Sequence, residues 1–576
     1  MSRAWGMMGG TGLFLALMLV VGWPALATVL EATRAVALLE RVLHRAGWTE
    51  GAEALARWQG LDEPSDSGSV IDPAASAAVQ QEPRGLARPI RLAFESLGLV
   101  LGSQAIALPL GVLLAILLWR TDVWGRHVLL ALVALAAFVP LPLHATAWLG
   151  ALGNAGRIQM IGLQPILVGR FGAAVVHAMA SLPWVVLIAG VGLCAVEPEL
   201  EEAALLETGP GRVLARVTLR RAIGAIAAAA LAVAVLTAGD MTVTDLLQVR
   251  TYAEEAYLQY VLWRNPADAA VVALPPLVGL GLLIGLVGRA LARLDPARLV
   301  SSFGRARVWR LGRWRILWGV VLMVLVGTAI AFPLCSLIWR AGRVGGRAAL
   351  GQPPTWSLSG LMGTLRFAAS EIQDPLGASL LWTAVAATAT ALMAFALAWA
   401  GRRSRAWRGT LLATMVLTLA TPGSVAGMAL ILAYRSVPAI ADSAAMIVMA
   451  ATLRALPYAL LVLWPFLQSF PQEYLDAAAL DGHGPAGQMI HVTLPLSRRA
   501  LLAAWAVAFA LGLGELPATN LVAPPGVQPM SYFIWHLLHT GVESHLAGVA
   551  LIMLLVIAIA GLAAAAAVRW VRPPAW

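Results

Sequence analysis

Two polar segments interrupt an otherwise apolar chain, and their residues could bind a partner protein. Each begins with an acid and two alanines and then reaches a glycine; these residues are Glu202, Ala203, Ala204 and Gly209 in the first segment and Asp476, Ala477, Ala478 and Gly482 in the second. Alanine favours a short helix with a small surface, and glycine ends it. The acid is free to pair with a basic residue of another protein. We therefore predict two helix–turn–helix projections that act by docking; the alternative is that they are ordinary amphipathic connectors.

The two polar segments belong to a longer internal repeat. Gly209-Pro210 corresponds to Gly484-Pro485, and Leu182-Pro183-Trp184 corresponds to Leu456-Pro457-Tyr458. A repeat of this length in an apolar chain indicates two homologous helical bundles. The two predicted projections should therefore occupy equivalent places in the two bundles.

Two acids follow the polar segments by one apolar stretch and would lie within the membrane. They are Asp240 and Glu515, and further polar residues follow each of them, namely Thr242, Asp245, Thr519 and Asn520. A charged residue at this depth usually faces a cavity or a partner. One interpretation is that these six residues line or gate a path between the bundles. The other is that they cap helix ends at the outer interface.

A second polar cluster lies near the end of the chain. It contains His536, His539, Glu543 and His545, and the first repeat has no counterpart to its histidines. Two histidines on one helix face could hold a metal ion. Because the repeat lacks them, we interpret the cluster as interfacial polar residues instead.

The composition excludes several classes of protein. The chain has 576 residues, of which 60% are hydrophobic and 12% charged, whereas a soluble domain carries about 25% charged residues. We therefore expect an all-α polytopic membrane protein.

All 40 basic residues are arginines. A phosphate-binding P-loop needs a lysine, so any ATPase that drives this chain is another polypeptide. The net charge of +10 indicates basic cytoplasmic loops and no nucleic-acid binding.

Hydropathy and length predict about twelve transmembrane helices, six in each repeat. The ranges are 7–30, 92–118, 128–150, 171–195, 222–238, 268–291, 316–338, 378–400, 410–434, 444–468, 500–517 and 546–568. The first range is either a cleaved signal ending near residue 27 or, as we favour, a retained helix. The predicted domains are a first repeat at 1–295 with an extracytoplasmic loop at 31–90, a basic cytoplasmic linker at 296–315 and a second repeat at 316–576.

The arginines predict the orientation of these helices. Arginines are denser in the loops that would face the cytoplasm when both ends of the chain are inside. Each polar segment follows the fourth helix of its repeat. Because six helices per repeat is an even number, both segments face the cytoplasm and the repeats are parallel.

The polar segments resemble the EAA loop of permease subunits of bacterial ABC importers, in which Glu-Ala-Ala is followed by a glycine and a stretch ending in Leu-Pro. The second segment fits, with Asp476 for glutamate, Gly482 at the glycine and Leu494-Pro495 at the end. In the first segment Thr208 occupies the glycine position and Gly209 comes one residue late, as a one-residue deletion would produce.

The resemblance implies a transport subunit that is not itself an enzyme. Its two loops would be coupling helices that bind two copies of a separate ABC ATPase. ATP would bind those subunits, and this chain would hold no cofactor and no metal. The other partners would be an extracytoplasmic solute-binding protein and the lipid of the bacterial inner membrane.

The substrate implied by the resemblance is ferric iron, because fused double permeases of this length resemble the ferric-iron importers. The same architecture importing thiamine or another small solute or anion is the alternative. A secondary transporter driven by an ion gradient is a rival of a different class. It would account for the acids within the membrane but not for two matched polar loops.

Overall fold

The computed structural model describes residues 13, 15–31, 87–153, 164–263, 266–292, 307–345, 355–540 and 543–570. Within these ranges the chain is mainly helical, and its one strand pair joins β1 (Arg343–Val344) antiparallel to β2 (Thr355–Trp356). Most of the predicted extracytoplasmic loop and much of the predicted linker lie outside the described residues.

Among the described residues, six helices are long and apolar enough to cross a membrane. They are α4 (Ala87–Arg120), α8 (Gly169–Cys194), α17 (Trp314–Ala341), α19 (Gln373–Arg403), α23 (Ala445–Gln468) and α30 (Glu543–Trp570). Four bent pairs of helices raise the number of candidate spans in the described residues to as many as ten. The two other predicted spans correspond to shorter apolar helices at Leu15–Glu31 and at Leu277–Arg289, the latter within α15 (Pro266–Ala292). Twelve spans therefore stays a prediction.

Two of the predicted spans are sharply broken. The range 128–150 forms α5 (Arg126–Ala136) and α6 (Leu141–Leu152), which meet at 106°, and the range 410–434 forms α20 (Arg405–Ala420) and α21 (Gly423–Tyr434), which meet at 110°. The extended residues Pro140 and Pro422 lie at these bends. A proline has no backbone N–H to continue the preceding helix, so one helix ends and a second begins there.

The described elements follow the same order in the two halves of the chain. A long helix (α4 or α19) leads to a bent pair, a second long helix (α8 or α23) and then a short helix, α9 (Pro198–Glu207) or α24 (Gln472–Leu480). Next come a bent segment ending in α12 (Ile223–Ala238) or α27 (Arg498–Leu513), two short helices, and α15 or α30. The short helices are α13 (Thr242–Leu246) and α14 (Tyr252–Trp263) in the first half and α28 (Pro517–Val522) and α29 (Met530–Thr540) in the second. The repeat in the sequence predicts this order.

The two halves interlock through their first and last helices. Helix α17, the first of the second half, packs against α5 and α6, whereas α15 packs against α20 and α21. The helix at 15–31 contacts the second half, because Trp23 Nε1 donates a hydrogen bond to the Ala433 carbonyl at 2.9 Å. One core cluster joins Leu143 and Met241 to Leu516 and Met530. The halves therefore share a core.

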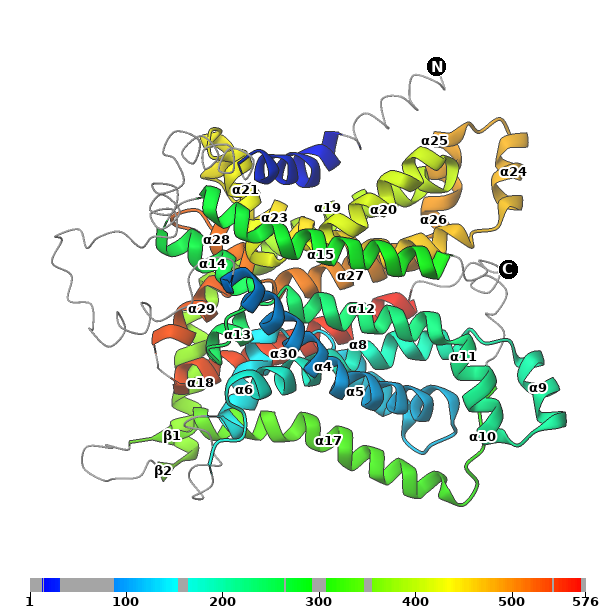
Figure 1. Ribbon diagram of the computed structural model, residues 1–576, viewed down its shortest axis with the longest axis horizontal. Helices are drawn as coiled ribbons and strands as arrows, with labels where there is room; N and C mark the ends of the chain where they lie inside the picture. Colours follow the sequence, from blue (N-terminus) through cyan, green and yellow to red (C-terminus); the bar gives the residue numbers. More distant parts are fainter. Residues whose placement is uncertain are drawn as a thin grey trace.

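Helices α9 and α24 lie at the same end of the molecule, at the right of Figure 1. Helices α13, α14, α28 and α29 lie at the other end (Figure 1). We call these ends the loop face and the opposite face. The two polar segments therefore lie at the same end of the molecule, as the sequence predicts.

Candidate functional site

The two polar segments form short projections that turn in different ways. Helix α24 ends before Gly482, whose φ of 83° lies in the left-handed region that favours glycine. Helix α9 ends at Thr208, which is extended with φ −148° and ψ 161°. No left-handed residue is therefore needed in the first turn. This difference accounts for the threonine at the position where the second segment has glycine.

After its turn, each segment returns to the membrane through a similar run of short helices. The first has α10 (Pro210–Val213), the π-helical η2 (Leu214–Thr218) and α11 (Leu219–Arg221). The second has α25 (Pro485–Gly487), the π-helical η4 (Gln488–Thr493) and α26 (Leu494–Leu496). Bends of 62° and 75° then lead into α12 and α27. Each returning run therefore lies at a steep angle to the spanning helix that it enters.

Each projection exposes one large apolar side chain near its tip. Leu206 in α9 is 89% exposed, and Leu480 in α24 is 90% exposed. A single exposed leucine is common on a protein surface, but these two occupy matching places on matching helices. The alanines between the acids and these leucines are partly open, except that Ala478 is buried. The exposed leucines give each projection an apolar contact that another protein could cover.

The acids at the start of the projections already have partners. Glu202 Oε1 lies 3.5 Å from Nη1 of Arg307, which belongs to the predicted linker. Asp476 Oδ1 accepts a hydrogen bond of 2.9 Å from Gln472, one helical turn earlier. The two acids are therefore not unpaired within the chain, and their pairing with a basic residue of another protein stays a prediction. Both contacts are exposed and weak, so a basic group on a partner could replace them.

A buried ion pair fixes the first projection to the membrane helices. Arg120, at the end of α4, and Glu201, in α9, are both 0% exposed. Arg120 Nη2 donates to Glu201 Oε1 at 2.5 Å, and Nη1 donates to the Leu193 carbonyl of α8 at 2.7 Å. Thr218 Oγ1 donates to the same carboxylate at 2.5 Å. The Arg120 side chain thus joins α4, α8 and α9 at one point.

The second projection is fixed by arginines that contact neutral groups. Arg402 Nη1 donates to the Leu467 carbonyl at the end of α23, and Nη2 donates to Gln472 at 3.0 Å. Arg403 donates to Gln488 at 2.8 Å. Leu475, the counterpart of Glu201, is buried and apolar. The anchor of the first projection is therefore an ion pair, and that of the second is a set of hydrogen bonds.

The segment before α17 packs against the loop that follows Arg120. The backbone N–H of Trp309 donates to the Arg120 carbonyl at 2.8 Å, and the N–H of Leu311 donates to Asp122 Oδ1 at 2.8 Å. Helix α17 begins a few residues later. The first projection is thus connected through Arg120 to the first helix of the second half.

The two acids that were predicted to lie within the membrane cap short helices. Asp240 Oδ2 accepts a hydrogen bond of 2.9 Å from the N–H of Val243 in α13. Glu515 accepts from the N–H groups of Ala518 and Thr519 in α28, at 3.0 and 2.8 Å. The contacts of the capping interpretation are therefore present, as expected for carboxylates at helix N-termini. They hold the first turns of α13 and α28 at the opposite face.

Each capping acid also faces a basic side chain from a long helix. His177 Nε2 in α8 lies 3.6 Å from Asp240 Oδ2, and Arg454 Nε in α23 lies 4.0 Å from Glu515 Oε1. Arg454 also donates to the Thr421 carbonyl at the bend before α21, at 2.7 Å. The second half therefore links its capping acid to its bent helix through one arginine.

The halves meet at the opposite face through residues from the predicted path. Asp245 Oδ2 lies 3.1 Å from His539 Nε2, and Asn520 Nδ2 donates to the Tyr257 hydroxyl at 3.4 Å. Thr242 and Thr519 are buried behind them. Burial raises the pKa of Asp245, an effect that His539 opposes. Of the six predicted residues, Asp245 and Asn520 thus contact the other half directly.

Deeper in the protein, equivalent aromatic residues face each other between the halves. The rings of Trp184 in α8 and Tyr458 in α23 have centroids 6.1 Å apart. Close to them, Gly514 at the end of α27 lies against Pro140, such that a Cβ there would be 2.8 Å from the proline Cγ. These contacts join α8 to α23 and the end of α27 to the bend between α5 and α6.

Residues 393–574 match the family of binding-protein-dependent transport system inner membrane components. The matched segment begins within α19 and contains α24, Leu480 and Glu515. It covers less than half of the chain, and the first projection lies outside it. The match indicates a permease of binding-protein-dependent ABC transport, a class of membrane transport subunits that are generally not enzymes. No curated relative matches the chain.

The histidine cluster of the permease segment does not converge on one point. His539 faces Asp245, Glu543 lies 3.4 Å from Arg343, and His545 stacks on Phe367. Across the described ranges, no three side chains from His, Cys, Asp and Glu are placed to hold a metal ion.

Sequence reasoning missed the anchoring arginines and the exposed leucines. The leucines could have been found, because Leu206 and Leu480 stand at the same distance from their Ala-Ala pairs. Arg120 and Arg402 were visible as positive charges at helix ends but were interpreted only as signs of orientation. Nothing in the sequence indicated that Glu201 is buried with Arg120.

Proposed function

We propose that this chain is the fused, double-domain permease of an ATP-driven importer that depends on a binding protein. The observation that carries the proposal is the pair of projections at the loop face, each with an exposed leucine at an equivalent place. The family match at residues 393–574 supports it, as does the common order of the described elements in the two halves of the chain.

In this proposal the loop face is cytoplasmic, with both chain ends inside, and each projection binds one ATPase subunit. Two projections in one chain correspond to two ATPase copies. ATP binds between those copies, because the chain has no lysine with which to form a P-loop. Their closure pushes α9 and α24. Through Arg120 the push on α9 reaches α4, α8 and the segment before α17, whereas Arg402 and Arg403 carry the push on α24 to α19.

The opposite face would open in response and receive solute from an extracytoplasmic binding protein. The closed contacts there, Asp245 with His539 and Asn520 with Tyr257, would separate. Asp240 and Glu515 would keep α13 and α28 intact while these helices move. Replacing both acids by Asn and Gln tests the gate. We expect the double variant to import less solute than the wild type at the same protein level. Unchanged uptake would refute the proposal that these acids belong to the gate.

Docking at the projections is tested by Leu206→Asp and Leu480→Asp. Each places a charge where the ATPase groove would desolvate it, so we expect loss of ATPase from the purified complex. Glu473→Ala is the matched control, because Glu473 is exposed at the far end of α24 and should leave binding unchanged. Normal ATPase binding by both leucine variants would refute the docking role.

We propose ferric iron as the substrate, on the resemblance of fused permeases to ferric-iron importers; thiamine or another small solute or anion is the alternative. The ligand of the binding protein that stimulates this transporter would decide between them. A secondary transporter is less well supported, because the buried acids that favoured it serve as helix caps. Uptake by the chain alone in an ion gradient, without an ATPase, would establish that rival.

A further inference from the structure

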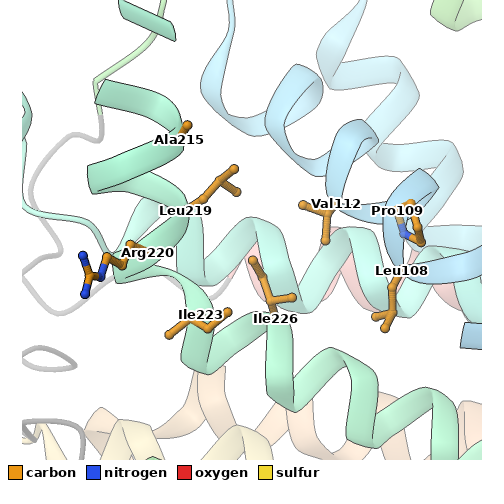
Figure 2. Close-up of a pocket in the computed structure, with 8 residues that line it drawn as sticks. All are labelled: Leu108, Pro109, Val112, Ala215, Leu219, Arg220, Ile223 and Ile226. Atoms are coloured by element: carbon orange, nitrogen blue, oxygen red, sulfur yellow. The ribbon is translucent and has the colours of Figure 1, made fainter. Parts of the chain in front are cut away.

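An apolar groove lies at the elbow where the first projection re-enters the membrane. Its volume is about 490 Å3, and it is bounded by α4, the run from η2 to α11, and α12. Figure 2 shows Leu108 and Val112 of α4 on one side and Leu219 and Ile226 on the other. Arg220 lies at the far end from Leu108, with its guanidinium directed away from the apolar side chains (Figure 2).

The groove belongs to the surface that faces lipid. On α4, Phe94, Leu97, Leu101 and Leu113 are exposed and recur at helical spacing along the length of the helix. Phe94 and Leu97 lie toward the opposite face, where the two halves are in contact. Because these two side chains are exposed at that depth, the stripe does not belong to the interface between the halves. Leu108 and Val112 lie beside this stripe. The groove therefore opens toward acyl chains of the bilayer.

Arg220 marks the headgroup end of the groove. It belongs to α11, which ends just before the bend of 62° that leads into α12 and lies close to the loop face (Figure 1). Within the described part of the chain it has no ion pair or hydrogen-bond partner, whereas its neighbour Arg221 pairs with Glu197 at 2.5 Å. A basic side chain at the mouth of a groove between membrane helices is complementary to an anionic lipid headgroup.

We propose that this groove binds one anionic phospholipid, with an acyl chain between α4 and α12 and the phosphate on Arg220. The second half lacks the basic residue, because Pro495 follows Leu494 where Arg220 follows Leu219. The equivalent elbow of the second half therefore lacks this headgroup contact. The lipid would brace the angle between the first projection and α12, so it would act on one projection only.

Native mass spectrometry of the full chain tests the site directly and needs neither the ATPase nor a substrate. The chain is released from nanodiscs that contain equal parts of phosphatidylglycerol and phosphatidylcholine. Arg220→Gln removes the headgroup contact, and Val112→Trp fills the groove. Arg212→Gln is the control, because Arg212 is an exposed arginine of the same segment that does not line the groove.

We expect the wild-type chain and Arg212→Gln to retain one phosphatidylglycerol, and Val112→Trp to lose it. Arg220→Gln should retain it about fivefold less well, the value of one surface charge against an anionic lipid. Since Arg220 has no partner among the described residues, this variant should fold normally, which size-exclusion chromatography checks. The proposal would be overturned if Arg220→Gln retained as much phosphatidylglycerol as the wild type, or if Arg212→Gln lost as much as Arg220→Gln. It would also be overturned if the chain retained phosphatidylcholine equally well, or if a protein were found in the groove instead of a lipid.

Discussion

Removing Arg120 should release the first projection from the membrane helices. In Arg120→Met, the carboxylate of Glu201 stays buried with Thr218 as its remaining partner. Breaking a buried ion pair by removing one partner costs about 3–5 kcal/mol. Because Arg120 also binds the Leu193 carbonyl, the cost should lie in the upper part of this range. The same reasoning predicts a cost of similar size for Glu201→Leu, which leaves the arginine buried.

The double variant Arg120→Met with Glu201→Leu should be more stable than either single variant. The second projection shows that the site accepts an apolar residue, since Leu475 is buried at the position of Glu201. Replacing a buried ion pair by apolar residues of similar volume is often neutral or stabilising. The free energy of unfolding of the double variant should therefore return close to the wild-type value.

Thermal unfolding in detergent compares the four proteins, and the ratio of ATP hydrolysed to substrate imported measures coupling in the assembled transporter. We expect both single variants to unfold at lower temperature and to hydrolyse ATP with little import. The double variant should regain stability but not full coupling, because the polar link from α9 to α4 is gone. Additive losses in the double variant, or single variants with wild-type stability and coupling, would refute the reasoning.

Two further predictions concern the packing and the ionisation of the protein. Gly514→Ala should destabilise the protein by about 1–3 kcal/mol through overpacking, because its Cβ would lie 2.8 Å from Pro140. Gly363→Ala is the control, because a Cβ there would have nothing within 4 Å. It should be neutral or slightly stabilising when both variants are compared by thermal unfolding in detergent. Glu254, in α14 outside the candidate spans, is buried, and this burial raises its pKa to about 7. The folded state therefore favours the protonated acid, so its contribution to stability is complete below the ordinary pKa of 4.5 and is lost as the pH rises through 7. Glu254→Gln should raise the melting temperature at pH 8 and leave it unchanged at pH 4.5, and an equal effect at both values would contradict the assigned pKa.

The elements with strong local signals could be predicted from the sequence. The apolar runs predicted the long helices, since their length and hydropathy are local properties. The polar segments predicted α9 and α24 to within a few residues at their N-termini, because alanine and the glycine turn act locally. The capping role of Asp240 and Glu515 was one of two interpretations, and their spacing from α13 and α28 is consistent with it.

The arrangement between helices could not be predicted in the same way. Hydropathy does not say which helix α17 packs against, and a proline such as Pro140 can either kink a helix or end it. The buried ion pair of Arg120 and Glu201 could not be predicted from the repeat, because the second half has Leu475 at the position of Glu201. The contact of Asp245 with His539 joins residues far apart in sequence, and the histidine has no counterpart in the first repeat.

Cross-linking from the two projections tests the central claim most directly. Single cysteines at Leu206→Cys and Leu480→Cys, in a chain whose Cys194 and Cys335 are replaced by alanine, are treated with a bifunctional reagent in inside-out vesicles that contain the ATPase. The account predicts that each position cross-links to an ATPase subunit, with two subunits captured when both cysteines are present. Reaction of only one position with the ATPase, or access to the two positions from different sides of the membrane, would contradict it.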